Sequence, residues 1–256
     1  MTEFIIVAES SADVAVATTL VERLLIQNID WLDDENLQHL LVWSGLDSTG
    51  CSFWKDLNQI QQQFERNGFR IPRYLGHGKS GKKRADGAAA MKVLNLVRLL
   101  QKDRQIDAVF LIRDLDDQSE RKEGLRQARL ENIDREPKLA IVIGAANPKR
   151  EAWVLNGFVP IDDNEAKILQ KLKQRLSFDP CEEAERLREK SSDGPVRIRN
   201  SKFVLNLLTQ GNLEREQQCW QETNLELLKK RGSETGIVDF FDEVLEMIVP
   251  LFTTFC

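Results

Sequence analysis

The chain has 256 residues, of which 41% are hydrophobic and 30% are charged. A chain of this length can bury one substantial core, or one domain with a helical appendage. The net charge of −5 excludes a protein that coats nucleic acid non-specifically over its whole surface, but it is compatible with a local basic groove.

Cysteine usage and hydropathy narrow the class of protein further. The four cysteines lie far apart and form no CxxC pair, which argues against a structural zinc site and indicates free thiols in a reducing compartment. No apolar run is long enough to cross a bilayer, and the N-terminus enters a strand-like run without a basic leader segment. We therefore expect a cytoplasmic protein that is not associated with a membrane.

The first part of the chain alternates strand-like and helix-like segments. Short buried runs predict strands at Phe4–Ala8, His39–Trp43, Ala108–Ile112 and Leu139–Ile143. Between them, periodicity predicts a helix capped by Ser10, Ser11 or Asp13 and ending at Leu25, then helices at Phe53–Arg66, Ala88–Leu100 and Glu120–Leu130, with a loop over 67–87. This alternation predicts βαβ crossovers and an α/β fold with a small parallel sheet flanked by helices.

After Pro160 the pattern becomes helical only. The expected helices are Asp162–Leu176, Glu182–Lys190, Lys202–Leu208, Leu213–Lys230 and Ile237–Phe252. We therefore predict an α/β domain over residues 1–160 and a helical C-terminal region over residues 161–256. The last helix has one broad apolar face, which indicates either ordinary core, the favoured interpretation, or a surface for a partner.

Acidic residues follow three of the expected strands. Glu9 follows the first strand, Asp114 and Asp116 follow the third, and Glu151 comes a few residues after the fourth. Because the carboxyl ends of parallel strands share one edge of a sheet, these side chains are expected to lie together. In an extended segment Asp114 and Asp116 would point the same way. Clustered carboxylates suit Mg²⁺ or Mn²⁺; the alternative is that each acid is a helix cap or a solvated loop residue.

A basic stretch occupies residues 66–84 and contains no acid. Such a run can neutralise phosphates, although it could equally be a solvated loop. We expect it to border the acidic edge. The letters of Gly76–Lys82 fit G-x-x-x-x-G-K, but Lys83 stands where a P-loop needs Ser or Thr to hold Mg²⁺. The residues predicted to bind nucleic acid are Arg73, Lys79, Lys82, Lys83 and Arg84.

Several of these segments resemble a known family. The strand that leads to Glu9, together with the D-x-D in Val109–Asp117, resembles the Toprim pattern. The segment Glu151–Leu155, which reads EAWVL, and the tail from Leu227–Gly232 to Asp239–Phe241 are similar to a poorly characterised prokaryotic Toprim-like family. That family is similar to the nuclease domain of overcoming-lysogenization-defect proteins, and its members are often encoded beside ATPases.

The resemblance implies a role for each acid. Glu9 would act as general base or metal ligand, Asp114 and Asp116 would hold Mg²⁺, and Glu151 would be a further ligand. Two such ions could stabilise the attacking and leaving oxygens of a phosphodiester cleavage. Toprim folds also serve topoisomerases and primases, but the only tyrosine, Tyr74, lies in a loop and the cysteines form no zinc module.

Two functions follow as expectations. The first is a Mg²⁺-dependent nuclease or nuclease-like phosphoesterase that cleaves nucleic acid, DNA rather than RNA. It would use Glu9, Asp114 and Asp116 as catalytic residues and would work with an ATPase partner in defence against foreign DNA. The alternative is a non-catalytic Toprim-like interaction subunit of an ATPase complex.

Overall fold

The computed structural model describes residues 2–70, 77–78, 81–82, 84–191 and 193–253. The chain forms two compact units. The sheet unit comprises Met1–Arg113, Gln118–Gly144 and Asp242–Cys256, and the helical unit comprises Asp114–Asp117 and Ala145–Phe241. The predicted α/β class is confirmed. The units do not divide the chain at a single point near residue 160, because the turn 114–117 belongs to the helical unit and the end of the chain belongs to the sheet unit.

A parallel sheet with the order β2-β1-β6-β7 forms the centre of the sheet unit. In β1 the residues Phe4–Ala8 are fully buried, as expected when helices cover both faces of a sheet. Thr2 of β1 pairs with Leu41 of β2, and Val7 pairs with Leu111 of β6. The strands are β1 (Thr2–Ala8), β2 (Leu41–Ser44), β3 (Ser52–Phe53, which pairs with the end of β1), β6 (Ile106–Asp114) and β7 (Ala140–Ala146).

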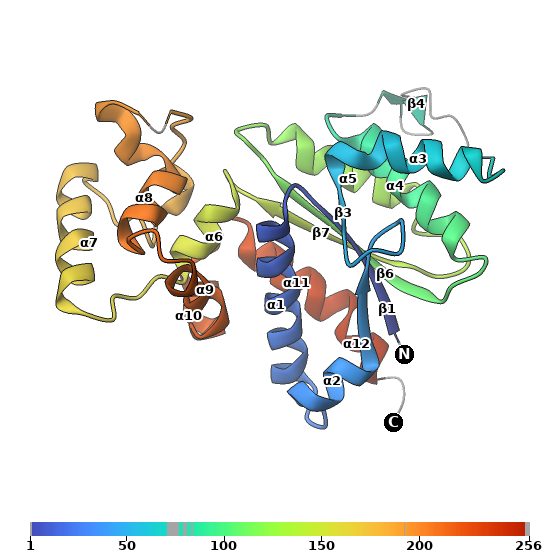
Figure 1. Ribbon diagram of the computed structural model, residues 1–256, viewed down its shortest axis with the longest axis horizontal. Coiled ribbons are helices and arrows are strands. Elements are labelled where there is room, and N and C mark those ends of the chain that lie inside the picture. Colours follow the sequence, from blue (N-terminus) through green and yellow to red (C-terminus); the bar gives the residue numbers. More distant parts are fainter. Residues whose placement is uncertain (1, 71–76, 79–80, 83, 192, 254–256) are drawn as a thin grey trace. The chain divides into compact units, whose positions relative to one another are not determined.

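Helices lie on both faces of this sheet (Figure 1). One face carries an aromatic cluster in which Phe4 contacts Trp43, Phe110 and Phe252, with ring centroids 5.5, 5.5 and 6.3 Å apart. Phe252 comes from α12, so α12 covers that face together with α1. The helices of the sheet unit are α1 (Ser11–Asn28), α2 (Asp34–Leu40), α3 (Leu57–Arg66, after the 3-10 turn Trp54–Asp56), α4 (Gly87–Leu100), α5 (Glu120–Leu130) and α12 (Val249–Thr253).

Close backbone packing fixes α5 beside the turn that precedes α4. A Cβ atom at Gly124 would lie 1.9 Å from the Ala85 carbonyl oxygen and 2.7 Å from the Gly87 nitrogen. Only glycine permits this approach. Helix α5, which follows β6 in the chain, is therefore packed against the backbone at Ala85, just after the basic stretch.

The outer edge of β7 is covered by side chains. Of the described strands, β7 is last in the sheet order. Glu243 of α11 (Ile237–Met247) accepts the Ile143 N–H at 2.6 Å, and Arg129 of α5 donates to the Ile141 carbonyl at 3.3 Å. Arg129 and Glu243 also form an ion pair at 2.8 Å. Two outward-facing backbone groups of β7 are thus already hydrogen-bonded.

The helical unit is arranged around α6 (Arg150–Asn156), which contacts α8, α9 and α10. Its core includes the side chains of Trp153 and Phe158. The other elements are α7 (Asp163–Leu176), two 3-10 turns at Ala184–Arg186 and Pro195–Arg199, α8 (Ser201–Leu208), α9 (Leu213–Gln221), α10 (Leu225–Arg231) and the first part of α11.

The predicted helix over Glu182–Lys190 is wrong. Only Ala184–Arg186 forms a 3-10 turn, and Arg188 instead makes an antiparallel bridge with Asn200. Glu189 N–H donates to the Arg199 carbonyl, and the Asn200 amide donates to the Glu189 carbonyl. These tertiary hydrogen bonds override the helical propensity of a charged segment.

Other expected elements were placed with different bounds. The helix predicted over Leu213–Lys230 is divided at Asn224, whose side chain caps α10. The last predicted helix is divided before Pro250, which lacks the N–H that a continuous helix needs. The fourth predicted strand continues through Gly144 to Ala146. Two short helices, α2 and α6, were not predicted. Ser10 caps α1, as one of the alternatives predicted.

The last apolar face lies in the core. Ile237, Phe240, Phe241, Val244 and Ile248 are fully buried. The favoured interpretation of this helix is therefore confirmed for these five side chains. None of the described helices combines the length and apolar character needed to span a membrane.

The thiols differ in how far they are exposed, which gives a first testable prediction. Cys181 and Cys219 are buried, and burial raises the pKa of Cys181 and raises that of Cys219 to about 12. The Cys51 thiol is partly exposed. Because the thiolate is the reactive form, we expect iodoacetamide at pH 8 to label Cys51 in the native protein, and Cys181 and Cys219 at least roughly 1,000-fold more slowly. Peptide mass spectrometry gives each rate; labelling of Cys219 as fast as Cys51 would contradict the burial.

Candidate functional site

The turn after β6 is held in an unusual backbone conformation. The φ angles of Asp116 and Asp117 are 47° and 63°, two successive non-glycine residues in the left-handed region. This conformation costs an L-residue about 1–2 kcal/mol, less for aspartate than for most residues. The turn is pinned by hydrogen bonds from Leu115 N to the Ala146 carbonyl and from Asp116 N to the Pro148 carbonyl, at 2.8 and 2.9 Å. Residues kept in such conformations cluster at functional sites.

The turn does not continue the extended conformation of β6. The segment is extended only as far as Asp114, the last residue of β6. Side-chain alternation therefore does not decide which way Asp116 and Asp117 point. The premise that Asp114 and Asp116 share one extended segment is wrong.

Each aspartate of the turn has a donor beside it. Asp114 Oδ1 accepts the Arg150 backbone N–H at 2.8 Å. Asp116 Oδ1 lies 3.5 Å from Lys149 Nζ, and Asp117 Oδ1 accepts from Arg188 Nη1 at 2.5 Å. All of these residues belong to the helical unit. The hydrogen bond to Asp114 is of the kind that a helix cap would make, because Arg150 begins α6.

Glu151 lies in the first turn of α6 and shares a cation with another acid. Arg150 Nη2 lies 3.4 Å from Glu151 Oε1, and Arg150 Nη1 lies 2.8 Å from Glu216 Oε1. All three side chains are at least four-fifths buried. Sequence reasoning missed Lys149 and Arg150, although both directly precede the EAW segment. Nothing in the sequence distinguishes Glu216 from Glu214, the other acid of its helix.

Glu9 belongs to a second group of charges, in the sheet unit. It follows β1, and its Oε1 lies 3.1 Å from Arg113 Nη1 and 3.7 Å from Arg121 Nη1. Asp86, with φ of 61°, approaches the same two arginines, at 2.7 Å from Arg113 Nε and 3.6 Å from Arg121 Nε. We call Glu9, Asp86, Arg113 and Arg121 the guanidinium cluster. Sequence analysis named only Glu9 among them.

A divalent cation suits these residues in chemistry but not in their present arrangement. Carboxylate oxygens are the ligands that Mg²⁺ prefers. Within the described ranges, however, no three His, Cys, Asp or Glu side chains are grouped closely enough to hold a metal ion. Lys149 lies 3.5 Å from Asp116 and Arg150 lies 3.4 Å from Glu151, so each of these acids already has a cation beside it. The expectation that Glu9, Asp114, Asp116 and Glu151 share a metal site stays a prediction.

Most of the side chains predicted to bind nucleic acid lie outside the described residues. This applies to Arg73, Lys79 and Lys83, and to the side chain of Lys82, whose backbone forms part of the short hairpin β4 (His77–Gly78) and β5 (Gly81–Lys82). Arg84 is described: its N–H donates to Gln127 at 3.0 Å and its guanidinium pairs with Glu120 at 3.3 Å. Two residues later, Asp86 pairs with Arg113. The end of the basic stretch thus lies beside the carboxyl end of β6.

The EAW segment and the C-terminal tail lie together in the helical unit. Trp153 is only 2% exposed, its indole N–H donates to the Thr235 carbonyl at 2.7 Å, and its ring stacks on Phe240 with centroids 5.2 Å apart. Gly236, with φ of 84°, passes so close to Ala145 that a Cβ atom would lie 2.3 Å from its carbonyl oxygen. Trp153 is therefore a core residue, as its apolar setting predicted.

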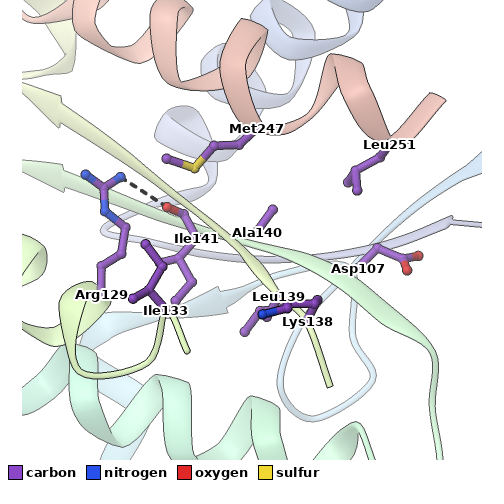
Figure 2. A pocket seen from close by; sticks show the side chains of 9 residues that line it. All are labelled: Asp107, Arg129, Ile133, Lys138, Leu139, Ala140, Ile141, Met247 and Leu251. Atoms are coloured by element: carbon purple, nitrogen blue, oxygen red, sulfur yellow. Dashed lines mark hydrogen bonds between the residues drawn. The ribbon is translucent and has the colours of Figure 1, made fainter. Parts of the chain in front are cut away.

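The sheet unit also contains an apolar cavity of about 410 Å³. It lies at the start of β7, and Figure 2 shows Arg129 at one end, donating to the Ile141 carbonyl. None of the predicted site residues lines it. The lining residues are Asp107, Arg129, Ile133, Lys138, Leu139, Ala140, Ile141, Met247 and Leu251.

Comparison with known proteins adds no further assignment. No protein-family model, curated protein or solved structure matched the chain. The Toprim resemblance therefore rests on the short motifs quoted above.

Proposed function

We propose that this chain is a Mg²⁺- or Mn²⁺-dependent nuclease or nuclease-like phosphoesterase that acts on nucleic acid in the cytoplasm. The observation that carries the proposal is the turn after β6. Glycine would relieve the strain at Asp116 and Asp117, yet both positions carry an acid. Two successive carboxylates in such a conformation are expected where their oxygens are used.

The neighbouring cations support the same proposal. Lys149 and Arg150 balance Asp116 and Glu151, and either cation can contact phosphate oxygens once a substrate arrives. Asp114, Asp116 and Glu151 are the proposed metal ligands of the helical unit. Glu9 is the proposed contribution of the sheet unit as base or ligand. The preference for DNA, the ATPase partner and a role in defence rest on the resemblance alone.

A second function is favoured by a different observation. Asp114, Asp116, Glu151 and Glu9 all have a cationic or N–H partner, and no metal-binding group of three was found within the described ranges. A site in which every acid already has a cationic or N–H partner suits a non-catalytic interaction subunit of an ATPase complex. In that case the charges stabilise the fold and perform no chemistry.

One experiment separates the two functions. The purified chain is incubated with plasmid, single-stranded DNA and RNA, each with Mg²⁺, Mn²⁺ or EDTA. We expect cleavage with either metal and none with EDTA, and faster cleavage of DNA than of RNA. A folded protein that cleaves none of the three, and whose melting temperature does not respond to Mg²⁺, would leave only the interaction subunit.

A further inference from the structure

Two arginines of the sheet unit converge on the same two oxygen atoms. Arg113 and Arg121 lie 3.1 and 3.7 Å from Glu9 Oε1. They lie 2.7 and 3.6 Å from Asp86 Oδ2. Two guanidinium groups directed at shared oxygens are the arrangement by which proteins bind phosphate, because each group offers paired N–H donors.

Rigid elements hold both arginines in place. Arg113 is the last residue but one of β6, and it stacks over the Trp54 ring at 5.5 Å from its centroid. The Trp54 indole N–H in turn donates to the Ile112 carbonyl at 2.7 Å. Arg121 lies in the first turn of α5, which Gly124 fixes against the chain at Ala85. The side chains of Arg113 and Arg121 are 17% and 15% exposed, so water still reaches them.

The two carboxylates of the cluster differ in exposure. Asp86 receives two hydrogen bonds from Arg113, from Nε to Oδ2 and from Nη2 to Oδ1, and is 18% exposed. Glu9 presents one oxygen to both arginines and is 30% exposed. With both acids in place the cluster is neutral; without Glu9 it carries one positive charge. Glu9 is the more exposed acid of the two, so a ligand that arrives from solvent reaches it first.

We infer that Arg113 and Arg121 form a phosphate-binding pair that Glu9 occupies at rest. The Glu9 carboxylate stands where an oxygen of a nucleic-acid phosphate binds, and the phosphate displaces it. This inference rests on the proposed function, because it assigns the phosphate to the substrate. It also gives Glu9 two positions, and the outward one is available for the role of base or metal ligand.

Phosphate binding without metal tests the inference. Affinity for inorganic phosphate and for a short single-stranded DNA is measured by calorimetry in EDTA. Glu9→Gln should raise both affinities by about tenfold, because it removes the competing charge and keeps the side-chain size. Arg113→Gln and Arg121→Gln should each lower both affinities by about tenfold or more. If either glutamine variant fails to fold, the lysine variant replaces it and should show a smaller loss, since lysine keeps the charge without the fork of donors.

Arg129 and Glu243 provide a matched control. They form an ion pair in the same unit, the Arg129 side chain is about as exposed as those of Arg113 and Arg121, and Arg129 lies on the same helix as Arg121. Arg129→Gln and Glu243→Gln should leave both affinities unchanged. An equal gain in Glu243→Gln, or no gain in Glu9→Gln, would overturn the inference. A gain for inorganic phosphate alone would overturn the assignment to nucleic acid. Because no metal or cleavage is involved, failure here is distinct from failure of the proposed nuclease.

Discussion

Replacement of Asp114 by asparagine is expected to lower metal-dependent cleavage by about 100-fold or more while the fold survives. The asparagine oxygen can still accept the Arg150 N–H that Asp114 accepts at 2.8 Å. It lacks the negative charge that holds a divalent cation. Asp114 ends β6, so its backbone is fixed and no neighbour can take its place. Cleavage rates in Mg²⁺, measured on the DNA substrate that the wild type cuts best, test this expectation.

Melting temperatures distinguish a metal ligand from a helix cap. Without metal, Asp114→Asn should melt close to the wild type, because asparagine keeps the size of the side chain and the oxygen that accepts the Arg150 N–H. Mg²⁺ should stabilise the wild type by mass action and the variant much less. Asp162 is the matched control, since its side chain caps α7 by accepting the Glu165 N–H at 2.7 Å. If Asp114→Asn melts lower than wild type in EDTA and both respond equally to Mg²⁺, Asp114 is a cap.

The largest loss of stability is expected for Trp153→Ala, at about 3–5 kcal/mol of unfolding free energy. The change removes a buried indole, its stacking on Phe240 and its hydrogen bond to Thr235. The Thr235 carbonyl loses the hydrogen bond from the indole and keeps the one from the Asn147 N–H. Urea denaturation followed by circular dichroism measures the effect.

Trp153→Phe separates packing from the hydrogen bond. Phenylalanine can keep the stacking on Phe240 but cannot donate, so a loss of about 1–3 kcal/mol is expected. The order Ala, then Phe, then wild type in rising stability would identify Trp153 as a core anchor. A Trp153→Ala protein that is as stable as wild type but binds nucleic acid poorly would show that the indole stacks on bases instead.

The elements that could be predicted from sequence are those with strong periodicity. Residues 120–130 form α5 as expected, and the buried run at the start of the chain forms β1. Short elements were missed because seven residues, as in α2 and α6, contain too few turns to establish a period. Glu182–Lys190 has helical composition, but hydrogen bonds to residues distant in the sequence decide its structure, and no local pattern records them.

The candidate site, like the fold, could be predicted from the sequence only in part. The parallel direction of β1 and β6, the strands that lead to Glu9 and Asp114, could be predicted from the alternation of strands and helices. The side chains around Glu9 could not, because the guanidinium cluster draws Asp86, Arg113 and Arg121 from three separate segments. The left-handed turn at Asp116 and Asp117 was also hidden, since aspartate tolerates that conformation without requiring it.

The side chains that cover the outer edge of β7 also limit how this protein can associate. An exposed edge strand is a template on which a strand from another molecule can add, which is the first step of many aggregates. At Ile141 and Ile143 the required backbone groups are already bonded to Arg129 and Glu243. An incoming strand would have to displace Arg129 and Glu243 to reach these two groups, so the sheet resists growth through the middle of this edge.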